Sequence, residues 1–287
     1  MSKVYFSKSI TPETLVKLYD LLGRELCGNV AVKLSSGEPG GHHFLSADLI
    51  RPLVEKVRGT IVECNTAYQG KRFHTEDHYR TMEEHGFAAI APVEILDGEG
   101  ELSLPVKNGR HLKENVVGQG LSHYDSMLVL SHFKGHPMGG FGGAIKNIAI
   151  GVASSYGKKI VHGAGDAEVL WDADHDSFLE SMAEATSSVL DYLGKDNFAY
   201  VSVANLLSVD CDCLSNPAAP QMADIGVFAS LDPVSLDRAC VDAVYASEDA
   251  GKVHLIERIE TRNGTHTLDA AEALGLGSQS YELIKID

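Results

Sequence analysis

The regular alternation of strand-like and helix-like segments constrains the fold of this chain more than any other feature. Apolar runs typical of strands, at residues 4–7 and 29–36, are separated by a stretch with apolar residues at helical spacing, which Thr11 would cap and Pro12 would begin. Strands that alternate with helices need crossover connections, and these connections favour parallel pairing. The pattern predicts an α/β fold, a mainly parallel doubly wound sheet with helices on both faces.

The alternation continues along most of the chain. Further strands are expected at residues 59–65, 126–130, 198–207, 224–231 and 281–286, with a hairpin-like stretch over 97–109. Helices are expected from Ser46, at 75–85, from about Ala144, at 176–193 and from near Pro233, and Pro52 would interrupt the helix that Ser46 caps. No repeat or linker divides the 287 residues, and single cores grow to roughly 250–300 residues. We predict one domain over residues 1–287.

The charge of the chain restricts its partners. A formal net charge of −16 argues against binding to nucleic acid or to anionic membranes, because both reward Lys and Arg. No apolar run approaches the roughly 20 residues that cross a bilayer, and the first residues lack the features of a secretory signal, so a cytoplasmic location is expected. An odd number of cysteines, five, is a poor disulfide framework, and we expect most to be reduced. Packing in the core is the simplest role for Cys27, Cys64 and Cys240.

The first candidate site is the segment that follows the strand at residues 126–130. In an extended segment alternate residues share a face, so His132, Lys134 and His136 would point the same way. Three such nitrogen-bearing side chains can bind a metal, hold an anion or move protons. The alternative is a solvated strand end with polar residues outward.

A glycine-rich loop follows, and it leads into the helix expected from Ala144. Such a loop exposes backbone N–H groups and the positive end of the helix dipole, which together favour an anion. Lys146, one turn into the helix, would add a charge. Asn147 stands where a phosphate-binding loop requires Ser or Thr, and no acidic ribose partner follows at the dinucleotide spacing. The candidate binding residues are Gly139, Gly140, Gly142, Gly143 and Asn147; alternatively, the glycines allow tight packing of helix on sheet.

Two cysteines separated by one residue form the third candidate. Cys211 and Cys213 follow the strand at 198–207 and can ligate a soft metal, or one can act as a nucleophile. Structural zinc takes four ligands, so others would come from His132, His136, His162 or Cys64. The flanking Asp210 and Asp212 would raise the thiol pKa by repulsion, which indicates a metal or a lysine nearby. The alternative is a cysteine pair without a ligand.

A fourth strand-exit loop, residues 65–72, contains Arg72. A guanidinium group suits carboxylate or phosphate recognition, although exposed loop polarity explains it equally well.

These segments resemble the domain of unknown function 362 family. Its central signature is similar to SHFKGHPMGGFGGAIKNIAIG at 131–151, and its other signatures are similar to DCDC with residues 224–239 and to NTAYQGKR at 65–72. The resemblance implies a shared fold and site, in a family without an assigned reaction. Many relatives carry a bacterial ferredoxin insert after GKKIVHG. Residues 164–175 contain no cysteine here, so a ferredoxin-type pair of [4Fe–4S] clusters cannot be assembled.

The leading functional hypothesis is a metal- or iron–sulfur-associated enzyme acting on a small anionic substrate. Cys211 and Cys213, with His132 or His136, would hold iron, zinc or a cluster, while Lys134, Lys146 and His136 would carry the chemistry. One alternative is a non-catalytic protein that binds an anion at the glycine loop. The other is a thiol redox protein, which the neighbouring aspartates disfavour.

Overall fold

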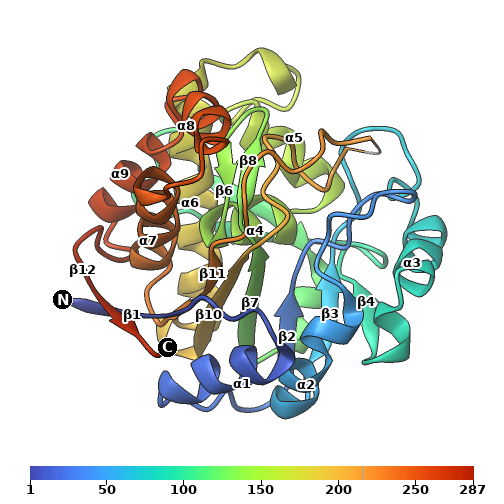
Figure 1. The fold of residues 1–287 in the computed structure, drawn as a ribbon. Coiled ribbons are helices and arrows are strands. Elements are labelled where there is room, and N and C mark those ends of the chain that lie inside the picture. The colour runs from blue at the N-terminus through green and yellow to red at the C-terminus, as the bar shows by residue number, and fades with distance from the viewer. Residues whose placement is uncertain (215) are drawn as a thin grey trace.

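A twisted eight-stranded sheet forms the centre of the molecule (Figure 1). The computed structural model describes residues 1–214 and 216–287. The strand order is β12-β1-β11-β10-β7-β2-β3-β4, and only β11 runs antiparallel to its neighbours among the described strands of this sheet. The predicted mainly parallel sheet is therefore confirmed. The bounds are β1 Ser2–Ser7, β2 Val30–Lys33, β3 Thr60–Glu63, β4 Val93–Ile95, β7 Ser126–His132, β10 Phe198–Ala204, β11 Gly226–Ser230 and β12 Tyr281–Lys285.

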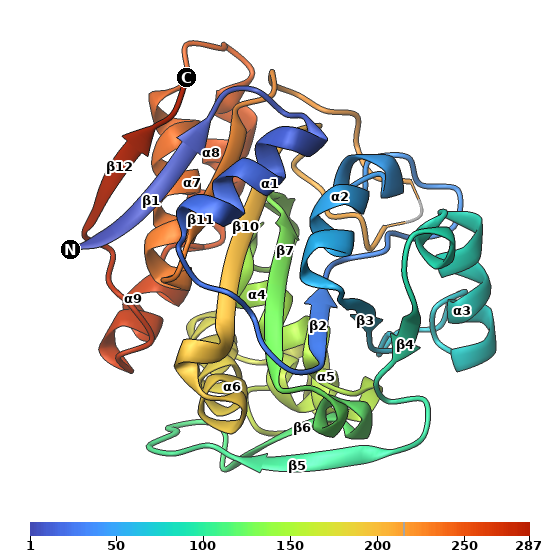
Figure 2. The same ribbon diagram turned by 90° about the horizontal axis from the view of Figure 1, so that it is seen from below.

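Helices cover both faces of the sheet (Figure 2). In β7, Leu128 and Leu130 pack into the core under α1, α2 and α3, whereas Met127 and Val129 pack into the core under α4, α6 and α7. This alternation follows from the two-residue period of a strand, and both faces are apolar because both are buried. The helices are α1 Pro12–Leu21, α2 Ala47–Val57, α3 Thr75–Glu84, α4 Ala144–Val152, α5 Ser155–His162, α6 His175–Leu193, α7 Pro233–Ala246, α8 Lys252–Thr261 and α9 His266–Ala273.

Three predicted helix starts are confirmed by their caps. The side chains of Thr11, Ser46 and Asp232 accept hydrogen bonds from the first turns of α1, α2 and α7. The expectation that Pro52 interrupts α2 is wrong, because Pro52 lies inside this helix. The proline removes one backbone hydrogen bond, but residues on either side of it, Ile50, Leu53, Val54 and Val57, are buried in the core.

The glycine-rich segment is more ordered than the expected loop. It forms a small antiparallel pair, β8 Lys134–His136 with β9 Gly140–Gly142, before α4 begins. The predicted hairpin-like stretch is β5 Glu101–Pro105, which pairs with β6 Glu114–Gly118. The sequence pattern did not indicate α5, α8 or α9. None of the described helices is both long and apolar enough to span a bilayer.

Candidate active site at the carboxyl ends of the strands

A cavity of about 350 Å³ lies where β2, β3 and β7 end. In the sheet, β3 and β4 lie on one side of β2, and the strands that follow them in the chain, β7 and β10, lie on its other side. Ligand sites of α/β sheets form outside the carboxyl ends of the strands at such a reversal. Side chains at these strand ends and in the loops beyond them line the cavity, among them Lys33, Glu63, His132, Lys134, His136, Lys146, Asn147, Lys158, His162, Cys211 and Cys213.

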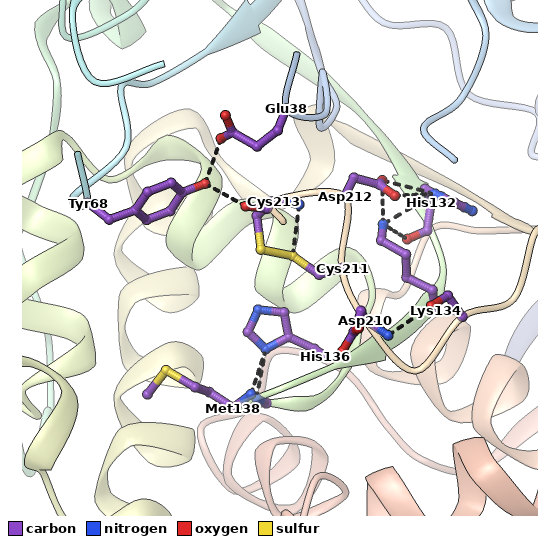
Figure 3. Close-up of a disulfide and its surroundings, with 12 residues drawn as sticks. Glu38, Tyr68, His132, Lys134, His136, Met138, Asp210, Cys211, Asp212 and Cys213 are labelled. Carbon is purple, nitrogen blue, oxygen red and sulfur yellow. Dashed lines mark hydrogen bonds and ion pairs between the residues drawn. A yellow bond between two sulfur atoms is a disulfide. The ribbon is translucent and has the colours of Figure 1, made fainter. Parts of the chain in front are cut away.

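The predicted meeting of residues 132–136 with residues 211–213 is confirmed (Figure 3). Cys211 and Cys213 form a disulfide, whereas the other three cysteines are free, so most of the five are reduced, as expected. His136 lies beside the disulfide. One of its ring nitrogens and the two cysteine sulfur atoms all lie within 4.8 Å of one another. We call His136, Cys211 and Cys213 the metal-competent group, because in the described part of the chain they are the set of His, Cys, Asp or Glu side chains that could hold a metal ion.

The His136 ring is fixed by the backbone of the glycine segment. Its Nδ1 accepts hydrogen bonds from the backbone N–H groups of Met138, at 3.2 Å, and Gly139, at 2.9 Å. The other ring nitrogen faces the disulfide in Figure 3. Burial, followed by the charge of Lys146, holds the pKa of His136 well below its usual range. The ring is therefore neutral, and because Nδ1 accepts both hydrogen bonds, its proton is on Nε2.

His132 and Lys134 hold the cysteine loop through Asp212. The Asp212 carboxylate lies 2.9 Å from His132 Nδ1 and 2.5 Å from Lys134 Nζ. Burial alone would raise the pKa of Asp212, but Lys134 and His132 outweigh it and lower the pKa to about 2. The lysine expected beside the aspartates is thus Lys134. His132 Nε2 also donates to the Asn205 carbonyl at 2.7 Å, so both its nitrogens are engaged and it lies outside the metal-competent group.

Arg72 lines the cavity and belongs to a buried ion-pair network. Its guanidinium lies 2.8 Å from Glu38 and 3.5 Å from Glu63. Glu63 also pairs with Lys33 at 2.8 Å. Burial would raise the pKa of Glu63, but Lys33 and Arg72 lower it to about 2. The Tyr68 hydroxyl, 2.8 Å from Glu38 and 3.0 Å from the Cys213 carbonyl, connects this network to the cysteine loop. No local pattern in the sequence points to Lys33, Glu38 or Glu63 as part of the site.

The expected anion cradle at the start of α4 is occupied by a side chain of the protein. The Asp237 carboxylate accepts from the backbone N–H groups of Ala144, at 2.7 Å, and Ile145, at 3.0 Å. A Cβ atom on Gly143 would lie 2.3 Å from Asp237 Oδ1. Gly140 sits at a positive φ of 77°, and a Cβ atom there would lie 2.9 Å from Gly264 Cα. These glycines allow close packing, the alternative that the sequence left open, and the two N–H groups at the start of α4 already have an acceptor within the protein.

Asn147 joins the ends of β2 and β7. Its amide nitrogen donates to the carbonyls of Lys33, at 3.1 Å, and Leu130, at 3.2 Å, and its amide oxygen accepts from Lys33 Nζ at 3.2 Å. The predicted binding residue is thus engaged in positioning the two strand ends.

Lys146 and Lys158 on the cavity wall differ from Lys33 and Lys134, because neither forms an ion pair within the described part of the chain. Lys146 of α4 has no hydrogen-bond or ion-pair partner among the described residues, and burial, together with Lys134 and Lys33, lowers its pKa to about 7. Lys158 of α5 donates to the Ala153 carbonyl at 2.6 Å, and burial lowers its pKa too. Lys158 was not predicted from the sequence, because the pattern did not indicate α5, the helix that carries it.

The remaining proposed ligands lie apart from the metal-competent group. His162 stacks on Phe178 and meets Trp171 edge-on, with ring centroids 4.8 Å and 4.6 Å away. The Cys64 thiol donates to the Val152 carbonyl at 3.2 Å. Cys64 and Cys240 are buried, as expected, whereas Cys27 is exposed, contrary to expectation, and all three are free.

Comparison with solved structures finds distant similarities. The lactate racemase apoprotein from Thermoanaerobacterium thermosaccharolyticum aligns at 12% identity over 69% of this chain and 50% of that one, with a TM-score of 0.43. A protein from Thermotoga maritima aligns at 13% identity over 82% and 59%, with a TM-score of 0.46. The chain thus spans between half and three fifths of the length of these two proteins.

Comparison of the sequence with family models identifies the family of the chain. No curated protein matches the chain. The family model described as "Domain of unknown function (DUF362)" matches residues 30–242, a span that includes the central and cysteine signatures. The chain therefore belongs to the domain of unknown function 362 family.

Proposed function

We propose that this protein is a metal-dependent enzyme that acts on a small anionic substrate. The observation that supports the proposal is the common location of two features on one cavity wall. One is the group of His136, Cys211 and Cys213, and the other is Lys146, which has no partner among the described residues. Metal-binding and anion-binding groups are thereby available to the same small molecule.

The three side chains fit a mononuclear zinc or iron site. Two thiolates and a neutral imidazole are ligands that both ions accept, and three protein ligands leave a position open for substrate, as in catalytic zinc sites. An iron–sulfur cluster held by protein side chains would require a further ligand. The thiolates become available when two electrons reduce the disulfide. We therefore propose a cytoplasmic location, where thiols are kept reduced.

In this proposal each neighbouring residue has a defined task. Lys146 binds the anionic group of the substrate and orients it. The backbone N–H groups of Met138 and Gly139 fix the orientation of the His136 ring, and the proton on its Nε2 would leave when that nitrogen ligates a metal. Asp212, held by Lys134 and His132, keeps the cysteine loop in place. A bound metal would supply Lewis-acid polarisation of a substrate oxygen.

Metal content of the reduced protein tests the proposal. Protein purified and reduced without oxygen should bind about one equivalent of zinc or iron, and a Cys211→Ser/Cys213→Ser double variant should lose it. Cys27→Ser is the matched control, because Cys27 is an exposed free thiol outside the cavity. Binding of less than about a tenth of an equivalent by the reduced wild type, or unchanged binding by the double variant, contradicts the assignment.

The disulfide itself supports a second candidate, a thiol redox protein. Cys211 and Cys213 line the cavity and can exchange with a small dithiol, which would be oxidised while the protein disulfide is reduced. In that case the reduced protein transfers electrons to a disulfide substrate without metal. A chelator distinguishes the two candidates, because it should abolish the metal-dependent activity and leave thiol–disulfide exchange intact.

A further inference from the structure

The cavity wall contains more positive than negative charge. Five cationic side chains line it: Lys33, Arg72, Lys134, Lys146 and Lys158. Three of them have carboxylate partners, since Lys33 pairs with Glu63, Arg72 with Glu38 and Lys134 with Asp212. In the described part of the chain, no carboxylate lies within ion-pair distance of Lys146 or Lys158. Two cations therefore remain without a counter-charge in one cavity, inside a protein whose net charge is −16.

Both unmatched lysines are placed where a ligand could reach them. Lys158 is 7% exposed, and the Ala153 carbonyl takes one of its three N–H donors. Lys146 has no protein partner among the described residues. Burying an ammonium group without a counter-charge is costly, so each lysine favours a ligand that brings a negative charge. The structure gives neither lysine another task that requires a free ammonium group.

The two lysines line the same cavity as His162. Burial brings the pKa of His162 to about 3, and the charges of both Lys146 and Lys158 lower it. The histidine is thus a neutral group within electrostatic range of both cations. Apolar side chains, Met138, Ile150 and Trp171, line the same cavity. A volume of about 350 Å³ is at the lower end of the range for small-molecule sites.

We infer that the cavity binds a small dianion, whose two negative charges are matched by Lys146 and Lys158. This inference rests on the proposed function and narrows its substrate class from anions in general to dianions. The two charges can lie at the ends of a short dicarboxylate or on one phosphate group. Lys158 thereby becomes a binding residue and sets the preference for two charges over one.

Isothermal titration of the oxidised, metal-free protein tests the inference without reference to the metal. The probes are succinate, its half-amide succinamate and inorganic phosphate, slightly below neutral pH, and the phosphate affinity is calculated for the fraction that is present as the dianion. Succinate and succinamate have nearly the same shape, but succinamate carries one charge fewer. Whichever of succinate and phosphate has the higher affinity should bind at least ten times more tightly than succinamate, because succinamate loses one charge-assisted hydrogen bond. Tighter binding of succinate would place the charges at two ends, and tighter binding of phosphate would place them on one centre.

Substitutions assign the second charge to Lys158. Lys158→Met should reduce dianion affinity about tenfold or more and leave succinamate affinity little changed, whereas Lys158→Arg should retain the preference. Lys159→Met is the matched control, because this neighbour on α5 does not line the cavity.

Three results would overturn the inference: equal binding of succinate and succinamate with no preference for phosphate, unchanged dianion affinity in Lys158→Met, or no binding of any probe. The comparison of probes on the wild-type protein decides the matter even if a variant does not fold. Metal binding by Cys211 and Cys213 would survive such a failure, so the proposed metal centre is tested separately.

Discussion

Replacing Asp212 by Asn should destabilise the protein strongly, because it removes the shared partner of Lys134 and His132. The carboxylate is 2% exposed, and it lies 2.5 Å from Lys134 Nζ. Removing one member of a buried ion pair leaves an uncompensated charge and costs about 3–5 kcal/mol. A fall in the pKa of Asp212 from 3.8 to about 2 independently corresponds to roughly 2.5 kcal/mol. Since the amide of Asn can still accept a hydrogen bond, we expect a loss of about 3 kcal/mol in the free energy of unfolding.

Urea denaturation at neutral pH measures this loss, with wild type and variants in the same oxidation state. Asp210→Asn is the matched control in the same loop. The Asp210 side chain is 20% exposed and lies 3.5 Å from Arg258, so its loss should stay below about 1 kcal/mol. A Lys134→Met/Asp212→Asn double variant should recover part of the stability, because the stranded ammonium is removed. Equal losses for Asp210→Asn and Asp212→Asn would refute the assignment of Asp212 as the anchor.

The pH dependence of the same variant provides an independent check. The folded-state pKa of Asp212 lies below its ordinary value, so the stabilisation is present above about pH 4 and is lost as the pH falls toward 2. The stability difference between wild type and Asp212→Asn should shrink over that interval. A difference that stays constant down to pH 2 would mean that the ionised carboxylate contributes no stability.

Three further predictions address the packing, the cysteines and the anion site. Gly143→Ala should lower the free energy of unfolding by about 1–3 kcal/mol, because its Cβ would overlap Asp237. Gly142→Ala should cost little, because its Cβ would lie 3.8 Å from the nearest atom, Lys146 Cδ. Similar losses for the two variants in urea denaturation would contradict this. In native protein a thiol reagent should modify Cys27 but not Cys64, since burial raises the pKa of Cys64 to about 12; mass spectrometry of the labelled peptides decides. Affinity for succinate should fall as the pH rises through about 7, where half-buried Lys146 loses its charge. Titration calorimetry showing constant affinity from pH 6 to pH 8 would refute this.

Local sequence determined the elements whose signals lie within a few residues. Thr11 with Pro12 and Asp232 with Pro233 begin helices because a side-chain acceptor and a fixed proline φ act locally. Apolar runs marked the strands, and their alternation with helices determined the mainly parallel sheet. The same rule, that polar groups gather at the carboxyl ends of parallel strands, correctly brought residues 132–136 to the cysteine loop.

Only the tertiary structure decided which polar side chains contact one another. His132, Lys134 and His136 alternate along one segment, yet two of them bind Asp212 and the third faces the disulfide. The N–H groups at the start of α4 require an acceptor, and the Asp237 side chain from a distant helix supplies it. Arg72 meets Glu38 and Glu63, and Lys146 meets no carboxylate in the described part of the chain. Pairings of this kind depend on long-range packing across the sheet, and no local pattern records them, so the sequence located the site while the fold assigned the roles within it.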